Sequence, residues 1–313
     1  MRQMPKLAVL LNELDTLMRP EEERVVLRFA RQVEDAGYDG VVTAEHIALG
    51  RNSTFRGFSG NPREFLMPGN QLPTQHWPNP FIKLAAIGAV TERVRLMACA
   101  TLAPLRHPLL NAKELATLDQ LSGGRLVIAP ICGWNRDEYD ALGVPWEDRG
   151  ARLDEHLAIL DLVLKQSPAT YHGRFYDFTD IYIEPKPVQP GGITIWAAGD
   201  RMTKKVVERI VKYGHGHCLI FQPSAEEKAY LDAELAKVGR SSSEIENVGT
   251  VYPTFPDSTS AADIVKAVED SVVPQIDNGA NVLIVKPSQF IDDPGEMPSF
   301  LKTFLKEVER AIT

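Results

Sequence analysis

Short apolar runs alternate with longer amphipathic segments along almost the whole chain. The short runs are rich in Val, Ile and Leu and do not show the helical period, which is typical of buried parallel strands. The longer segments repeat apolar residues three and four positions apart, as amphipathic helices do. This alternation predicts eight βα units. Their strands are expected at Lys6–Leu11, Gly40–Thr43, Arg95–Thr101, Leu126–Ile131, Ile193–Ala198, Gly216–Phe221, Asn247–Thr254 and Asn281–Lys286.

The helix before Gly37 shows the pattern most clearly. Val26, Phe29 and Val33 would share one face, and Gly37 supplies the stop. Eight βα units in 313 residues suit a (β/α)8 TIM-type barrel that forms one domain over residues 1–313. The first strand is not followed by a GxGxxG motif, so a doubly wound dinucleotide-binding sheet is disfavoured.

Two segments between the predicted strands are longer than ordinary loops. Residues 46–80 follow the carboxyl end of the second strand and mix glycine, proline and aromatic residues, which favours a substrate lid over the active face. Residues 168–192 precede the fifth strand and contain a predicted β-hairpin. Both segments are expected to be insertions into the barrel.

Two pairs of residues flank the fourth strand and belong to opposite ends of the barrel. Gly123 and Gly124 precede the strand, so they belong to the bottom face, where residues mostly serve stability. Gly133 and Trp134 follow it and therefore lie at the top face. The chemistry of a barrel enzyme is expected at that second pair.

Composition and charge exclude several classes of protein. The chain is 44% hydrophobic and 24% charged, as an ordinary globular protein is. Its formal net charge of -8 argues against nucleic-acid binding, which needs a basic face. The apolar run near the N-terminus is too short for a signal peptide or a membrane span, so a cytoplasmic protein is expected. Three separated cysteines do not suggest a disulfide framework.

Two positions carry candidate chemistry. Glu45 and His46 end a strand at the mouth of the long loop, where a histidine can exchange a proton and an adjacent carboxylate can set its tautomer or raise its pKa. Gly199 lies between a strand and a helix, an order that suits anion binding by backbone amides. A loop cap at Glu45–His46 and a plain turn at Gly199 are the structural alternatives.

Other interpretations of the sequence point to different classes of function. His215 and His217 lie on the same side of a strand, and such a pair can bind zinc in a barrel hydrolase, but a metal site needs three or four ligands. No metal site is therefore predicted. A cofactor-free binding barrel is a third possibility. A serine hydrolase is disfavoured because the segment GFSGN lacks the nucleophile spacing. Arg149 and Arg152 are expected to form ion pairs on a helix face.

Three segments occur in a characteristic order between Glu92 and Asp200: RHPLLNAKELATLDQLSGGRL, GWNRDEYDALGVPWEDRGARLDEHLAIL and PKPVQPGGITIWAAG. In this order they resemble the bacterial-luciferase-like oxidoreductase superfamily, and most closely its branch that uses the deazaflavin coenzyme F420. The resemblance implies a TIM-type barrel, usually a homodimer, that transfers a hydride between F420 and a small organic substrate. A monooxygenase that uses flavin mononucleotide (FMN) is the near alternative.

The resemblance also implies roles for individual residues. Glu45 and His46 would lie beside the cofactor ring, and a non-proline cis peptide bond would occur at Cys99–Ala100. The turn after the fifth strand would hold the cofactor phosphate. The cofactor-binding residues implied in this way are Ala98, Cys99, Ala100, Gly133, Trp134, Ala198, Gly199 and Asp200.

Overall fold

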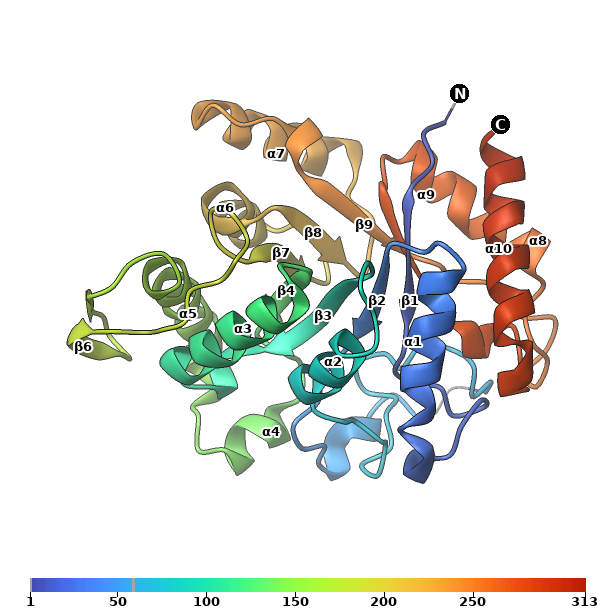
Figure 1. The fold of residues 1–313 in the computed structure, drawn as a ribbon, viewed down its shortest axis with the longest axis horizontal. Coiled ribbons are helices and arrows are strands. Elements are labelled where there is room, and N and C mark those ends of the chain that lie inside the picture. Colours follow the sequence, from blue (N-terminus) through green and yellow to red (C-terminus); the bar gives the residue numbers. More distant parts are fainter. Residues whose placement is uncertain (1, 58–59) are drawn as a thin grey trace.

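Eight parallel strands close into a barrel in the computed structural model, which describes residues 2–57 and 60–313 (Figure 1). The strands follow one another around the barrel in the order β1-β10-β9-β8-β7-β4-β3-β2. The predicted TIM-type fold is therefore confirmed. The strand bounds are β1 Lys6–Leu10, β2 Gly40–Thr43, β3 Arg95–Leu102, β4 Leu126–Ile131, β7 Thr194–Gly199, β8 Gly216–Leu219, β9 Glu246–Thr250 and β10 Val282–Val285.

Each barrel strand lies close to its predicted position, and the differences are at the ends. The largest is at β9, which was expected to continue to Thr254 but ends at Thr250. Pro253 follows two residues after Val251, and a proline has no backbone N–H to donate to a neighbouring strand. The chain therefore leaves the barrel before that residue.

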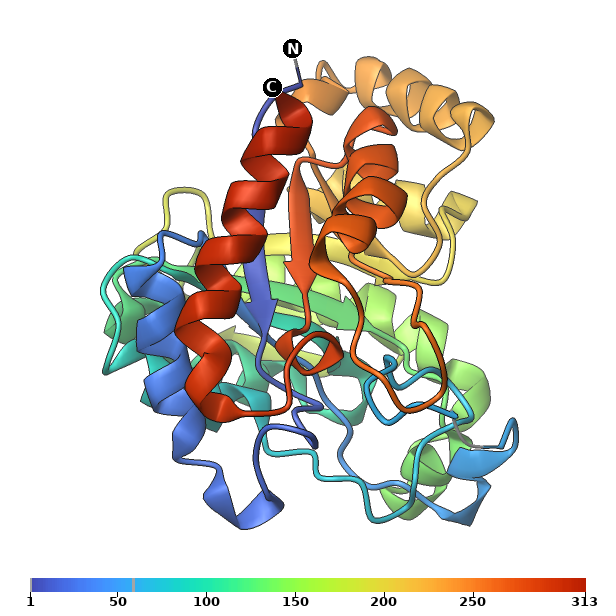
Figure 2. The ribbon, with the colours of Figure 1, turned by 90° about the vertical axis from the view of Figure 1, so that its right-hand side faces the viewer.

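Helices surround the barrel, and α10 runs alongside α1 on its outer side (Figure 2). The α3 helix shows how the sequence sets the bounds: Pro108 occupies its first turn, and Gly123 ends it in the left-handed conformation at φ 67°. The helices are α1 Val25–Asp35, α2 Pro80–Gly88, α3 Pro108–Ser122, α4 Arg136–Ala141, α5 Arg149–Val163, α6 Lys204–Tyr213, α7 Ala225–Lys237, α8 Ile264–Ala267, α9 Val273–Asp277 and α10 Met297–Ile312.

The segment 168–192 contains a small antiparallel hairpin outside the barrel. Its strands are β5 Ala169–His172 and β6 Asp177–Ile181, and they form a sheet of their own between α5 and β7. No helix in the part of the chain that the structure describes combines the length and apolar character needed to cross a membrane.

Strand alternation divides the apolar residues into two cores. On β3, Met97 faces the inside of the barrel, whereas Leu96 and Ala98 face the surrounding helices. Trp196 is fully buried and fills part of the barrel interior. Since the interior is packed with side chains, a ligand can enter only at the ends of the strands.

An ion-pair network around Glu246 ties together four strands at the amino-terminal end of the barrel. Its carboxylate accepts two hydrogen bonds from Arg95, at 2.7 and 3.0 Å, one from Lys6 at 2.6 Å and one from Trp196 Nε1 at 2.9 Å. Burial alone would raise the pKa of Glu246. The hydrogen bonds and charge of Arg95, together with the hydrogen bonds from Lys6 and Trp196, instead lower the pKa to about 2.

We predict that Glu246→Gln lowers the free energy of unfolding at pH 7 by roughly 3 kcal/mol. Because the pKa of Glu246 is lower in the folded than in the unfolded state, its contribution is full above about pH 4.5 and is lost as the pH falls through about 2. Urea unfolding at pH 7 and pH 3 should therefore give a smaller difference between variant and wild type at pH 3. Glu244→Gln, which changes an exposed carboxylate, is the control. A pH-independent difference would contradict this assignment.

Candidate active site

A cavity of about 950 Å³ lies at the carboxyl ends of the barrel strands. Residues in the last part of the strands or just after them line it, as expected for the active face of a TIM-type barrel. Its volume is at the upper end of the range for small-molecule sites, so both a cofactor and a substrate can be accommodated. One end is lined by arginines and the turn after β7, and the other by aromatic and aliphatic side chains.

His46 follows β2 and lines this cavity. Its side chain is only 8% exposed, and its Nδ1 lies 3.0 Å from Oε2 of Glu138. Trp77 and Trp134 contact the imidazole edge-on, with ring centroids 5.0 and 5.5 Å away. Because Nδ1 is engaged by the carboxylate, Nε2 is the ring nitrogen left to exchange a proton with a bound molecule.

Glu138, in the short helix α4, is the residue that sequence reasoning missed. Besides His46, its carboxylate accepts hydrogen bonds from the backbone N–H groups of Ile47, at 2.7 Å, and Ala48, at 3.2 Å. It thus orients the imidazole and fixes the start of the 46–80 segment. The available signal was a carboxylate four residues after Trp134, on the active-face side of β4.

The expected contact between Glu45 and His46 is wrong. Glu45 is buried and turns the other way, where it accepts hydrogen bonds from the backbone N–H of Leu102 at 2.8 Å and from both terminal nitrogens of Arg106. Consecutive side chains at the end of a strand point to opposite sides, which separates the two residues. Glu45 also lines the cavity, and its negative charge there is neutralised by Arg106.

The β3 residues divide in the same manner. Cys99 and Ala100 line the cavity, and the peptide bond between them is cis, as the family resemblance implied. The register with β4 shifts between Cys99 and Thr101. Ala98 is fully buried against the outer helices instead, so its expected contact with a cofactor is wrong: strand alternation turns it away from the cavity.

Gly133 and Trp134 also line the cavity. Gly133 has φ 76°, and a Cβ there would lie 2.5 Å from Cδ2 of Leu102, so the position requires glycine. The two polar residues that follow serve the local structure: Asn135 caps α4 through the N–H of Asp137, and the Asp137 carboxylate accepts from Asn52 at 2.8 Å.

The opposite end of the cavity suits an anion. Ala198, Gly199 and Asp200 line it, next to the start of α6. Three arginines, namely Arg149, Arg201 and Arg209, line the same region. Exposed amides at a helix start and nearby guanidinium groups both favour a phosphate.

The expected helix-face ion pairs of Arg149 and Arg152 are wrong. Within residues 2–57 and 60–313, neither forms an ion pair with a carboxylate. Arg149 lies 3.9 Å from the centre of the Trp146 ring, and Arg152 lies 4.4 Å from that of Phe175. Stacking on aromatic rings leaves the Arg149 charge available to the cavity, a difference that helix periodicity does not reveal.

His215 and His217 do not line this cavity. Nδ1 of His215 accepts the backbone N–H of Ile195, and His217 is buried, where desolvation and the charge of Lys228 lower its pKa to about 4. The described part of the chain contains no group of three or more His, Cys, Asp or Glu side chains arranged to hold a metal ion. The hydrolase interpretation thus has no support from the arrangement of this histidine pair.

The segment 46–80, of which residues 58 and 59 lie outside the described part, borders the apolar end of the cavity through Phe65, Leu66 and Met67. A buried ion pair holds it. Nζ of Lys286, a residue 1% exposed, donates to Glu13 Oε2 at 3.0 Å and to the carbonyl of Glu64 at 2.8 Å. The Glu13 carboxylate also accepts the N–H of Leu66, at 2.9 Å. This clamp fixes residues 64–66 against the barrel.

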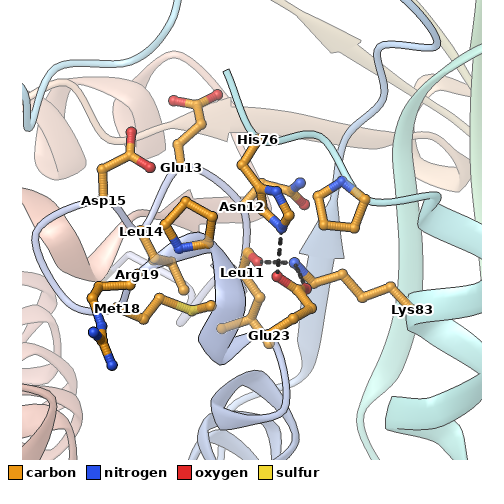
Figure 3. Close-up of a pocket in the computed structure, with 12 residues that line it drawn as sticks. Leu11, Asn12, Glu13, Leu14, Asp15, Met18, Arg19, Glu23, His76 and Lys83 are labelled. Atoms are coloured by element: carbon orange, nitrogen blue, oxygen red, sulfur yellow. Dashed lines mark hydrogen bonds and ion pairs between the residues drawn. The ribbon is translucent and has the colours of Figure 1, made fainter. Parts of the chain in front are cut away.

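A second contact holds the other end of the segment at a small hollow beside β1 (Figure 3). Glu23 there accepts from His76 at 3.3 Å and pairs with Lys83 at 2.7 Å, and Lys83 also donates to the carbonyl of Leu11 at 2.6 Å. Burial lowers the pKa of Lys83, and the charge of Glu23 opposes that shift. Both ends of the residue range 64–76 are therefore tied to the β1 side of the barrel.

Comparison with known proteins identifies the family. The family model described as luciferase-like monooxygenase matches residues 7–273 of the chain. The chain belongs to this family. The resemblance drawn from the sequence is thereby confirmed at the level of the superfamily, and the match leaves open whether the cofactor is F420 or FMN.

Individual relatives cover less of the chain. An FMNH(2)-dependent dimethylsulfone monooxygenase of Pseudomonas putida is 34% identical over 40% of this chain and 35% of its own length. The uncharacterized protein Mb0978c of Mycobacterium bovis is 40% identical over 42% of this chain and 47% of its own length. The chain thus spans about half or less of the length of these curated relatives.

Solved structures match over nearly the whole chain but at low identity. Monooxygenase RslO1 from Streptomyces bottropensis superimposes with a TM-score of 0.75 and 18% identity, covering 98% of this chain and 100% of that one. An F420-dependent secondary alcohol dehydrogenase superimposes with a TM-score of 0.71 and 14% identity, covering 98% and 99%. These matches support the fold.

We predict that breaking the Glu13–Lys286 clamp loosens residues 64–66. Lys286→Met leaves the Glu13 carboxylate buried without a counter-charge, which should cost about 3–5 kcal/mol, whereas Glu13→Gln combined with Lys286→Met removes both charges and should cost less. Both variants should be cleaved faster than wild type within residues 60–76 under limited proteolysis. Unchanged cleavage in the double variant would show that other contacts hold the segment.

Proposed function

We propose that this protein is an oxidoreductase that transfers a hydride between the deazaflavin coenzyme F420 and a small organic substrate. The observation that carries the proposal is the His46–Glu138 pair, held between two tryptophans in a large cavity that the Cys99–Ala100 segment of the neighbouring strand β3 also lines. A proton-exchanging group in a mostly apolar site is what hydride chemistry requires of a protein.

The residues present fit such a cofactor. At Gly199 a Cβ would meet only Val206 Cγ2, at 3.7 Å, so the fold itself does not require glycine there. Because glycine has no Cβ, a bound phosphate would be able to approach the backbone closely. Arg149 and Arg201 would add positive charge there, whereas the charge of Arg209 is already paired with Asp154 at 2.8 Å. Cys99, Ala100, Gly133 and Trp134 would hold the ring, and the bound cofactor would accept or supply the hydride.

His46 is assigned the proton transfer. Its Nδ1 is held by Glu138, so Nε2 would donate to, or accept from, the substrate atom whose charge changes during hydride transfer. Glu138 is a positioning residue, because it acts through the imidazole. Glu45, neutralised by Arg106, would shape the wall and keep the end of β3 in place.

Residues 46–80 are proposed to act as a substrate lid. Phe65, Leu66 and Met67 give the substrate side of the cavity an apolar surface, which excludes water from the reacting centre. The two clamps described above would keep this surface over the cavity.

An FMN-dependent monooxygenase is the second candidate. It is supported by the relative named FMNH(2)-dependent dimethylsulfone monooxygenase, while the structural match named F420-dependent secondary alcohol dehydrogenase supports the first. Both cofactors carry a phosphate and a planar tricyclic ring, so the same cavity residues would serve either one.

We further propose that the chain forms a homodimer. The α2–α3 surface supports this, since Ile82, Leu110 and Leu121 are exposed there by 73%, 67% and 72%. Exposed apolar side chains on two packed helices suit an isologous contact with a second copy.

Titration with F420 and with FMN tests the cofactor. We expect F420 to bind more tightly, and Gly199→Ala to weaken that binding by at least tenfold, because a Cβ would hinder the approach of phosphate to the backbone. Gly60→Ala is the matched control, since a Cβ there meets only Ser258, at 3.6 Å, outside the cavity. Tight binding of FMN without binding of F420 would favour the monooxygenase, and unchanged affinity of Gly199→Ala would remove this glycine from the site.

Replacement of the proposed acid–base residue tests the chemistry. His46→Asn keeps some hydrogen bonding but removes the titratable proton, so turnover should fall by about 10²–10⁴-fold while cofactor affinity changes little. Glu138→Gln should cause a smaller fall, because a neutral amide holds the imidazole less firmly than a carboxylate does. Steady-state and single-turnover kinetics measure both. Near-normal turnover of His46→Asn would exclude it as the acid, and lost cofactor affinity with normal chemistry would make it a binding residue.

A further inference from the structure

Two cysteines meet inside the barrel. Cys99 lies on β3 and Cys218 on β8, and the strands β4 and β7 lie between these two in the barrel. Both side chains pack against the apolar cluster that fills the barrel interior, so both point inward. Because two strands separate them, they come together through the interior rather than along the sheet. Closure of the barrel thus joins two thiols that are far apart in the sequence.

The two thiols interact directly. The hydrogen bond that Cys99 donates to Cys218, followed by burial, raises the pKa of Cys99 well above its ordinary value. Cys99 therefore keeps its proton within the pair, and the sulfur of Cys218 accepts it. Two sulfur atoms in contact on a fixed scaffold need little movement to form a disulfide, whereas distant cysteines need a rearrangement of the backbone.

Both thiols can be reached from the cavity. Cys99 and Cys218 line it, and each is free and partly exposed. The volume of about 950 Å³ easily admits a small oxidant. Cys132 lines the same cavity, but its thiol donates to the carbonyl of Arg149 at 3.6 Å. Cys132 is therefore a matched comparison: a thiol of the same cavity whose partner is a carbonyl instead of a second sulfur.

We propose that Cys99 and Cys218 are a redox-active pair, which hydrogen peroxide converts from two thiols into a disulfide across the barrel interior. This site is distinct from the proton-transfer pair of His46 and Glu138, and the proposal does not rest on the proposed function.

The reaction balances in two steps. Cys218, as a thiolate, attacks one oxygen of hydrogen peroxide, so that an S–O bond forms, the O–O bond breaks, and a sulfenic acid and water result. The sulfur of Cys99 then attacks the sulfenic sulfur. The S–S bond forms, the S–O bond breaks, and a second water leaves with the proton of Cys99. Each sulfur gives up one electron, and the peroxide gains two.

Oxidation of the purified protein tests the proposal. Reduced protein, freed of reductant, is treated with hydrogen peroxide, and its intact mass, its free thiols and its unreduced tryptic peptides are measured. Wild type should become two hydrogen atoms lighter and go from three thiols to one. Its digest should contain residues 96–106 joined to residues 213–228. Dithiothreitol should restore all thiols.

Two variants separate the pair from the third cysteine. Cys132→Ser keeps the pair, so it should give the same joined peptide and lose both of its thiols. Cys218→Ser should give no joined peptide and should not become two hydrogen atoms lighter. Circular dichroism checks that each variant is folded. If Cys218→Ser does not fold, the joined peptide of wild type and Cys132→Ser decides.

Several results would overturn the proposal. They are full retention of the thiols, oxidation of single cysteines without a joined peptide, a bridge through Cys132, and a bridge between two chains, which doubles the intact mass. The thiol measurements use no cofactor. Failure to bind both F420 and FMN would therefore refute the proposed function without affecting the assignment of this pair.

Discussion

The carboxylate of Glu138 is the contact on which the arrangement of the site depends. It accepts hydrogen bonds from three consecutive residues, the imidazole of His46 and the backbone of Ile47 and Ala48. One side chain from the segment after β4 thereby fixes the residues that leave β2, so the orientation of the proposed acid–base group and the start of the segment 46–80 are set together. Because the carboxylate is almost fully buried, removing it would leave several polar groups unpaired at once.

The same kind of contact recurs around the cavity: buried charged side chains hold loops through hydrogen bonds with backbone N–H and carbonyl groups. Glu45 accepts from the N–H of Leu102, and Glu13 with Lys286 grips residues 64–66. A buried ion pair adds little net stability compared with apolar packing, but it specifies one geometry, because any other leaves a charge unpaired. This favours a site whose walls are rigid on the barrel side and whose substrate preference resides in the apolar segment laid over it.

The barrel could be predicted from the sequence because its signal is local: apolar runs such as Leu126–Ile131 and stops such as Gly123 need no knowledge of distant residues. The position of His46 at the active face followed from strand order alone. Its partner did not, because Glu45 is adjacent in sequence while Glu138 is 92 positions away, and only the closed barrel brings β2 and the end of β4 together. Ala98 was assigned to the cavity for a related reason. Which alternate residues of β3 point into the barrel depends on how the strand pairs with its neighbours, and Ala98 points outward to the helices.

The two sides of the cavity, proposed to bind the cofactor and the substrate, differ in the ligand features that they would recognise. At the cofactor end, the ligand contacts would be made by backbone and by arginines stacked on rings, which either F420 or FMN can use equally, so this end selects a phosphate rather than a particular cofactor. On the side of the proposed lid, the lining is made by the side chains of Phe65, Leu66 and Met67, whose shape would discriminate between substrates. If the proposed lid contacts the substrate, substitutions in the segment 46–80 should change which molecule reacts before they change whether the cofactor binds.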